Sequence, residues 1–136
     1  MAFGGMSYIA IIVAAIASYV FGAVWYMALS KQWIAALGKT EAEFKARTPS
    51  AIPFVIAFIA QLVMAIILAG IIGHLGPPTP KTGLITAGLV YIGFVLTTLV
   101  TNHGFQGNKP SLTVIDGLHW LGVLLIQGLV IGLFGV

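Results

Sequence analysis

The sequence predicts an all-α integral membrane protein, a compact bundle of four transmembrane helices that forms one domain over residues 1–136. Hydrophobic residues make up 60% of the chain and charged residues only 7%, whereas about a quarter of the residues in a soluble domain are charged. The mean hydropathy is +1.09, which excludes a water-soluble globule. The apolar residues also gather in four stretches, each close to the roughly 20 residues that a membrane-spanning helix needs.

The predicted spans cover residues 7–29, 51–75, 83–101 and 114–134. The first is expected to be a retained helix, because it lacks the basic leading region of a signal peptide and stays apolar for longer than a signal core. Ser50 is a candidate N-cap for the second span, and Pro53 suits the opening turn of that helix. The third span follows Gly76–Gly83, a tight turn whose three prolines prevent the second helix from continuing.

A short amphipathic helix is predicted between the first two spans. Thr40 and Glu43 have the spacing of a capping box, in which each side chain accepts a hydrogen bond from the other residue's backbone amide. We therefore expect a helix that begins there and ends before Pro49. Apolar residues stand among the lysines of this segment, which predicts that it lies along the inner membrane surface. We interpret it as an amphipathic connector, with a dedicated lipid or partner site as the alternative.

The basic residues predict how the chain crosses the membrane. Lys31, Lys39, Lys45 and Arg47 lie between the first two spans, Lys109 lies between the last two, and Lys81 lies on the opposite side. Short loops rich in lysine and arginine stay in the cytoplasm, so we expect a multi-pass protein of the bacterial inner membrane with both termini on the periplasmic side. Topology thus explains the formal charge of +3, and no soluble basic face is left to bind nucleic acid.

Aromatic and small residues predict how the spans sit in the bilayer and pack. Tryptophan and tyrosine favour the headgroup level, so the expected anchors are Trp25, Tyr26, Trp33 and Trp120. Helices in lipid associate through close contacts and interhelical hydrogen bonds. The expected packing positions are Gly22, Gln61, Ala65, Ala69, Gly73, Gly93, Gly128 and Gly132. The last two have GxxxG spacing and could serve packing within one chain or against a second protein.

Polar groups gather in the stretch NHGFQGNKPSLTVIDGLHW. Asp116 and His119 face broadly the same way on a helix, and Gln127 returns to that side about three turns later. The predicted polar cluster comprises Asp116, His119, His103, Asn102 and Gln127. A structural interpretation places Asp116 in the first turn of its span, where an acid complements the helix dipole and pairs with a nearby cation. The alternative is proton handling, because histidine titrates near neutral pH and ionisable groups in membranes are commonly functional.

No catalytic residue, cofactor or metal site is predicted. The chain contains no cysteine, so it has no thiolate ligand or nucleophile. Gly-rich phosphate loops, an HExxH pair and a convincing Ser-His-Asp order are also missing. An enzyme is the less favoured class; it would use Asp116 and His119 as acid and base at the headgroup level, and it would need a groove open to lipid beside Trp120.

Three stretches of the sequence resemble the bacterial membrane family called domain of unknown function 1761: FGAVWYMALSKQWIAALGKTEAEFK, NHGFQG and IDGLHWL. Positions that match the family's pattern are Trp25, Tyr26, Asn102, Phe105, Gly107 and Trp120. Gln106 and His119 stand where the family has a glutamate and a tyrosine, and Met27 and Ala28 replace a Ser-Pro pair. The resemblance covers nearly the whole chain and implies a short four-span protein, but it implies no function.

The leading functional hypothesis is an accessory protein that packs with itself or with a larger membrane complex. Its alternative is an oligomeric transporter or channel for a proton or small solute, which would use the mouth formed by Asp116, His119 and His103. A polar cavity that continues past Gln127 would favour transport. A sealed interior packed by glycines would favour the accessory role.

Overall fold

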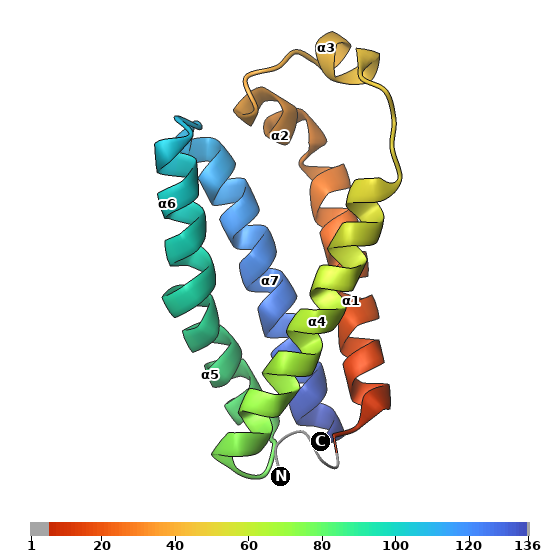
Figure 1. Ribbon diagram of the computed structural model, residues 1–136, viewed down its shortest axis with the longest axis vertical. Helices are drawn as coiled ribbons and strands as arrows, with labels where there is room; N and C mark the ends of the chain where they lie inside the picture. Colours follow the sequence, from red (N-terminus) through yellow and green to blue (C-terminus); the bar gives the residue numbers. More distant parts are fainter. Residues whose placement is uncertain (1–5, 136) are drawn as a thin grey trace.

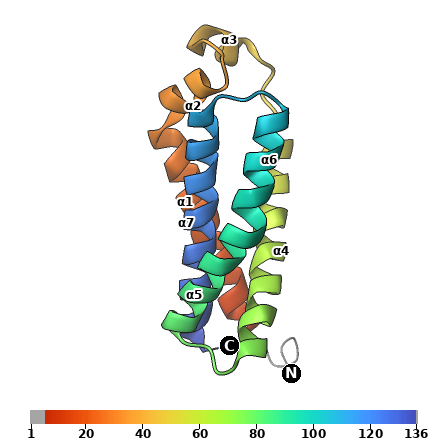
Figure 2. The same cartoon turned by 90° about the vertical axis from the view of Figure 1, so that its left-hand side faces the viewer.

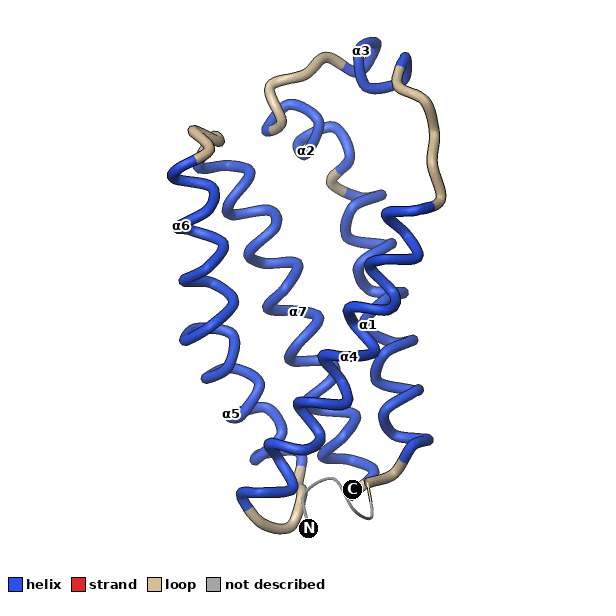
Figure 3. Tube along the Cα trace, viewed as in Figure 1, coloured by secondary structure: helices blue, strands red, loops and turns tan. Residues whose placement is uncertain are grey.

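The computed structural model describes residues 6–135, and the regular elements in that range are all helices (Figures 1 and 3). The predicted all-α fold is therefore confirmed for this part of the chain. Four helices are long and apolar enough to cross a membrane, which indicates a multi-pass membrane protein. They are α1 (Tyr8–Ala28), α4 (Ile52–Leu75), the continuous run from α5 to α6 (Pro80–Phe105) and α7 (Pro110–Phe134).

The third long helix changes its winding midway. It consists of α5 (Pro80–Val90), the π-helical segment η1 (Tyr91–Leu96) and α6 (Thr97–Phe105). It begins earlier than the predicted residue 83, because Thr79 is the N-cap before Pro80 and forms a capping box with Thr82 in the first turn. Proline is well tolerated at a first helical position, since the amide it lacks has no partner there.

The fourth long helix also begins earlier than predicted, at Pro110 rather than near residue 114. Asp116 consequently lies in the second turn, and no acidic residue occupies the first. The residue before the helix, Lys109, makes no side-chain cap; its ammonium donates to the carbonyl of Ala35 at 3.1 Å. The interpretation of Asp116 as a first-turn acid is therefore wrong, because the helix extends back to a proline that favours its start.

Two short helices lie between the first and second long helices. α2 (Ser30–Ala36) follows α1 after an interruption at Leu29, and the sequence analysis did not predict it. α3 (Glu41–Ala46) contains the predicted capping box: Thr40 Oγ1 accepts from the Glu43 amide at 3.1 Å, and Glu43 Oε1 accepts from the Thr40 amide at 3.3 Å.

The long helices run side by side and alternate in direction (Figures 1 and 2). α7 lies between α1 and α5, and α4 contacts α1, α5 and α7. Helices α2 and α3 and the turn between α6 and α7 share one end; the α4–α5 turn lies at the other (Figure 1). Lys31, Lys39, Lys45, Arg47 and Lys109 therefore gather at one end of the molecule, and Lys81 lies at the opposite end.

Glycines bring α5 and α7 into main-chain contact. A methyl group added at Gly128 would meet the Gly83 carbonyl oxygen, and one added at Gly132 would meet the Thr79 carbonyl oxygen. Both glycines of the GxxxG pair thus pack within this chain. Their partner Gly83 was missed by the sequence analysis, although Gly83 and Ala87 have the spacing of small residues that favours close helix approach.

The other predicted packing positions divide into two groups. Gly22, Gln61, Ala65 and Ala69 are buried between helices. Gly73 is half-buried, and Gly93 is exposed with no atom within 4 Å of a methyl group built on it. Gly93 therefore does not pack against another helix of this chain.

A buried hydrogen-bond network joins α1, α4 and α7 near their middles. Ser18 Oγ donates to Gln61 Oε1 at 2.7 Å, while Gln127 Nε2 donates to Ser18 Oγ at 3.1 Å and to the Gln61 carbonyl at 2.9 Å. All three side chains are at most 2% exposed. In an apolar surrounding, such bonds hold helices together because unpaired polar groups are costly there.

Candidate functional site

Asp116 lies in a hydrogen-bonded group that joins α1, α6 and α7. The Tyr26 hydroxyl donates to Asp116 Oδ1 at 2.7 Å, and His103 Nε2 lies 3.7 Å from Asp116 Oδ2. His103 Nδ1 lies 2.9 Å from Thr113 Oγ1. Trp25 also joins α1 to α7 next to Asp116, since its Nε1 donates to the Ile115 carbonyl at 3.1 Å. The carboxylate of Asp116 on α7 thus contacts α1 through Tyr26 and α6 through His103.

His119 occupies a different environment, although it is three residues away. Its imidazole ring is 5% exposed and lies among the rings of Tyr26, Trp120 and Phe21, with centroid distances of 4.8, 4.7 and 6.3 Å. Gly22 of α1 is also close to the ring, because a methyl group added there would lie 2.7 Å from His119 Nε2.

The imidazole of His119 has no hydrogen-bond partner among the described residues, and its Nδ1 is fully buried. Leaving a buried polar group unpaired costs about 1–3 kcal/mol, so such a group in a native protein calls for an explanation. A bound molecule that hydrogen-bonds the ring is one such explanation.

A cavity of about 810 Å³ lies beside His119, between α1, α4 and the α2–α3 segment. Tyr19, Gly22 and Tyr26 line it from α1, and His119 and Trp120 line it from α7. Its remaining walls are mainly apolar and come from α2, α3 and α4, where Trp33, Phe44, Phe54, Ala57 and Gln61 line it. The cavity lies beside Trp120, where an enzyme was predicted to need a groove.

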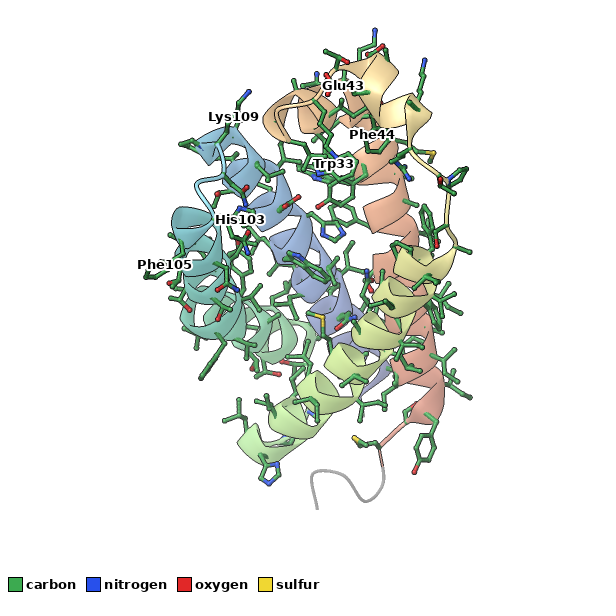
Figure 4. All side chains as sticks on the ribbon, turned by 45° about the horizontal axis from the view of Figure 1, so that its top comes forward. Trp33, Glu43, Phe44, His103, Phe105 and Lys109 are labelled. Carbon is green, nitrogen blue, oxygen red and sulfur yellow. The ribbon has the colours of Figure 1, made fainter. Side chains whose placement is uncertain are left out.

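A row of aromatic rings extends from the end of this cavity at α2 and α3 to His119. Figure 4 shows Trp33 and Phe44 near one another where α2 and α3 meet; their ring centroids are 5.4 Å apart. Trp33 lies 5.5 Å from Tyr26, and Tyr26 lies 4.8 Å from His119. Three of the residues predicted as interfacial anchors, Tyr26, Trp33 and Trp120, thus line the cavity, and Trp25 does not.

The profile of the protein family of unknown function DUF1761 matches residues 9–132. The chain belongs to the DUF1761 family. Comparisons with curated proteins and with solved structures found no match. Membership agrees with the resemblance carried by Trp25, Tyr26, Asn102 and Trp120, and it assigns no activity.

In this DUF1761 member, the five residues of the predicted polar cluster lie in four places. Asp116 and His103 lie together, His119 lies against the cavity, and Gln127 belongs to the buried network with Ser18. Asn102 is exposed on α6. Asp116 and Gln127 share a helix face, as their spacing predicted, because both bond to side chains of α1.

Sequence reasoning missed two features of the site. Arg47 was assigned to topology alone, but it lines the cavity. Tyr19 was not considered, although it lies on the same side of α1 as Tyr26, two turns away. The position of Arg47 in the amphipathic segment and the helix face that Tyr19 shares with Tyr26 were the sequence signals that could have indicated these two residues. Among residues 6–135, no group of three His, Asp or Glu side chains could hold a metal ion.

Proposed function

We propose that this protein is a multi-pass membrane protein that binds one amphipathic molecule from the membrane in the cavity between α1, α4 and α7. The observation that carries the proposal is the buried, unpartnered imidazole of His119 in the wall of that cavity. The ring nitrogen beside Gly22, which also lines the cavity, is Nε2, and a ligand with a hydrogen-bonding group at this depth would pair with it.

The size and chemistry of the cavity support this proposal. Ligand sites of about 300–1,000 Å³ with apolar walls and a few polar groups are typical of small-molecule binding, and this cavity measures about 810 Å³. Its apolar walls suit a hydrocarbon chain. Gln61 and His119 add polar groups on α4 and α7, so the expected ligand carries both a chain and a polar part.

Transport through the interior receives less support. The polar side chains past the cavity, Ser18 and Gln127, are fully buried and bonded to each other. On the other side of α7, Gly83 and Gly128 place two main chains in contact. Both features favour a closed interior over a polar path across the molecule.

The test is to purify the protein from its membrane in mild detergent and to identify retained molecules by native mass spectrometry and lipid extraction. His119→Phe keeps an aromatic ring of similar size and removes the imidazole nitrogens. It is expected to lower retention at least fivefold, from the lower range of a lost buried hydrogen bond. The control is His74→Phe, at the far end of α4 and outside the cavity lining. Wild-type protein without a bound molecule, or equal retention by both variants, would refute the proposal.

An accessory role, packing with itself or with a larger membrane complex, is the second candidate. One observation favours it: Gly93, Thr97 and Thr101 lie four residues apart on α6 and η1, and all are exposed. Small residues at this spacing allow close approach of another helix in lipid.

The accessory role is tested by the mass of the detergent-extracted assembly. Gly93→Leu would block close approach and should release a bound partner or second copy. Gly88→Leu is the matched control, since a methyl group at Gly88 also has no neighbour within 4 Å. If neither variant changes the assembly, the face formed by Gly93 has no partner.

A further inference from the structure

The end of the cavity at α2 and α3 has one cationic side chain. Arg47 is the single charged residue in its lining, and the guanidinium lies 4.0 Å from the centroid of the Phe44 ring. Among the described residues, no carboxylate lies within ion-pair distance of Arg47, since the one pair found joins His103 and Asp116. The guanidinium of this cavity-lining residue therefore has no internal anion.

The neighbouring sequence strengthens the positive charge of the mouth. The segment that carries α2 and α3 contains Lys31, Lys39, Lys45 and Arg47 against Glu41 and Glu43. Basic groups beside a membrane-spanning helix attract anionic lipids. The planar guanidinium fork in particular matches the oxygens of a phosphate group. Ser50, whose Oγ accepts from the Ile52 amide at 3.2 Å, also lines the cavity.

We infer that the ligand of the cavity is an anionic glycerophospholipid, with its phosphate at Arg47 and an ester oxygen at His119. This inference rests on the proposed function. Phe44, Trp33 and Tyr26 form a continuous wall between the two polar points. An acyl chain then lies against Tyr19, Phe54 and Ala57 on the apolar side.

Such a lipid meets each chemical demand of the site. The phosphate supplies the anion that Arg47 lacks, the ester carbonyl accepts a hydrogen bond from an imidazole N–H, and the chain fills apolar volume. A neutral lipid would leave the guanidinium without an anion, and a free fatty acid could not reach both polar points with its single carboxylate. A second copy of this chain would have to insert a side chain of its own.

The experiment uses the full chain in detergent micelles doped with equal amounts of phosphatidylglycerol and phosphatidylcholine that carry the same acyl chains. Native mass spectrometry counts each lipid retained. Wild-type protein is expected to favour phosphatidylglycerol about fivefold, the effect of one basic group near an anionic headgroup. Arg47→Gln should remove this preference while keeping a bound lipid, and Arg47→Lys should keep part of it. Lys39→Gln removes the same charge outside the cavity lining and should lower the preference much less than Arg47→Gln does.

The outcomes separate the two proposals. If Arg47→Gln prefers phosphatidylglycerol as strongly as Lys39→Gln does, the inference is wrong and the proposed function stands. If wild-type protein retains neither lipid, or retains only a second copy of itself, the proposed function fails and the inference fails with it. Circular dichroism of each variant establishes that the helices are intact.

Discussion

The contact between α5 and α7 predicts that a single methyl group at Gly128 destabilises the protein. In Gly128→Ala the new Cβ would meet the Gly83 carbonyl oxygen, and it would lie 2.9 Å from the Gly83 carbonyl carbon and from Ala87 Cβ. Because the carbonyl belongs to the main chain of a helix, it cannot rotate away as a side chain could. The two helices must therefore move apart along their shared face.

The magnitude follows from two opposing effects. Overpacking costs about 1–3 kcal/mol, and the upper part of that range applies because main chain meets main chain. Replacing glycine by alanine inside a helix returns about 0.5–1 kcal/mol. We therefore expect Gly128→Ala to lower the free energy of unfolding by about 2 kcal/mol.

The assay is unfolding by sodium dodecyl sulfate in mixed micelles, followed by circular dichroism. Gly88→Ala is the matched control, because it lies on α5 and a methyl group there has no neighbour within 4 Å. It should be as stable as wild type or slightly more stable. If Gly128→Ala is as stable as Gly88→Ala, the helices do not approach as closely as described.

Three further predictions concern polar groups and orientation. Asp116→Asn can still accept the hydrogen bond from Tyr26, so it should lower the free energy of unfolding by less than about 1 kcal/mol, whereas Asp116→Leu should cost about 1–3 kcal/mol; equal losses would show that the charge itself is what stabilises. Gln127→Leu removes two interhelical hydrogen bonds and should cost about 1 kcal/mol in the same assay, and an unchanged stability would show that the network does not hold the helices together. Because the chain has no cysteine, Pro77→Cys should react with an impermeant maleimide in intact cells and Lys39→Cys only after permeabilisation; the reverse pattern would invert the proposed orientation.

The apolar pattern was sufficient to predict the four long helices, because a span needs a long apolar stretch. Two helix starts were predicted too late, since Pro80 was treated as part of a turn and Pro110 was not considered, while both prolines begin helices. The close contact of Gly83 with Gly128 depends on which helices are neighbours, and the spacing within one helix does not determine that.

The site was only partly predictable for a similar reason. The face shared by Asp116 and Gln127 follows from helical periodicity within α7. The placement of His119 against a cavity depends on Gly22 of α1 and on the rings around it. Arg47 reaches the same cavity because α2 and α3 fold back over the end of α1 and α4, a tertiary arrangement without a local sequence signal.

The π-helical segment η1 determines which residue of α6 faces Asp116. In a continuous α-helix, Tyr91 and His103 would point about 120° apart, since each residue advances the helix by about 100°. One additional residue per turn in η1 brings them to within about 20° of each other, and both side chains do contact α7: Tyr91 donates to the Gly117 carbonyl and His103 lies beside Asp116. If η1 wound as an α-helix at unchanged length, α6 would rotate and Asn102, eleven residues after Tyr91, would turn toward the carboxylate. Deleting one residue from η1 would instead remove the need for the wider winding and keep His103 beside Asp116, so the π-helical segment accommodates one additional residue without exchanging an imidazole for an amide.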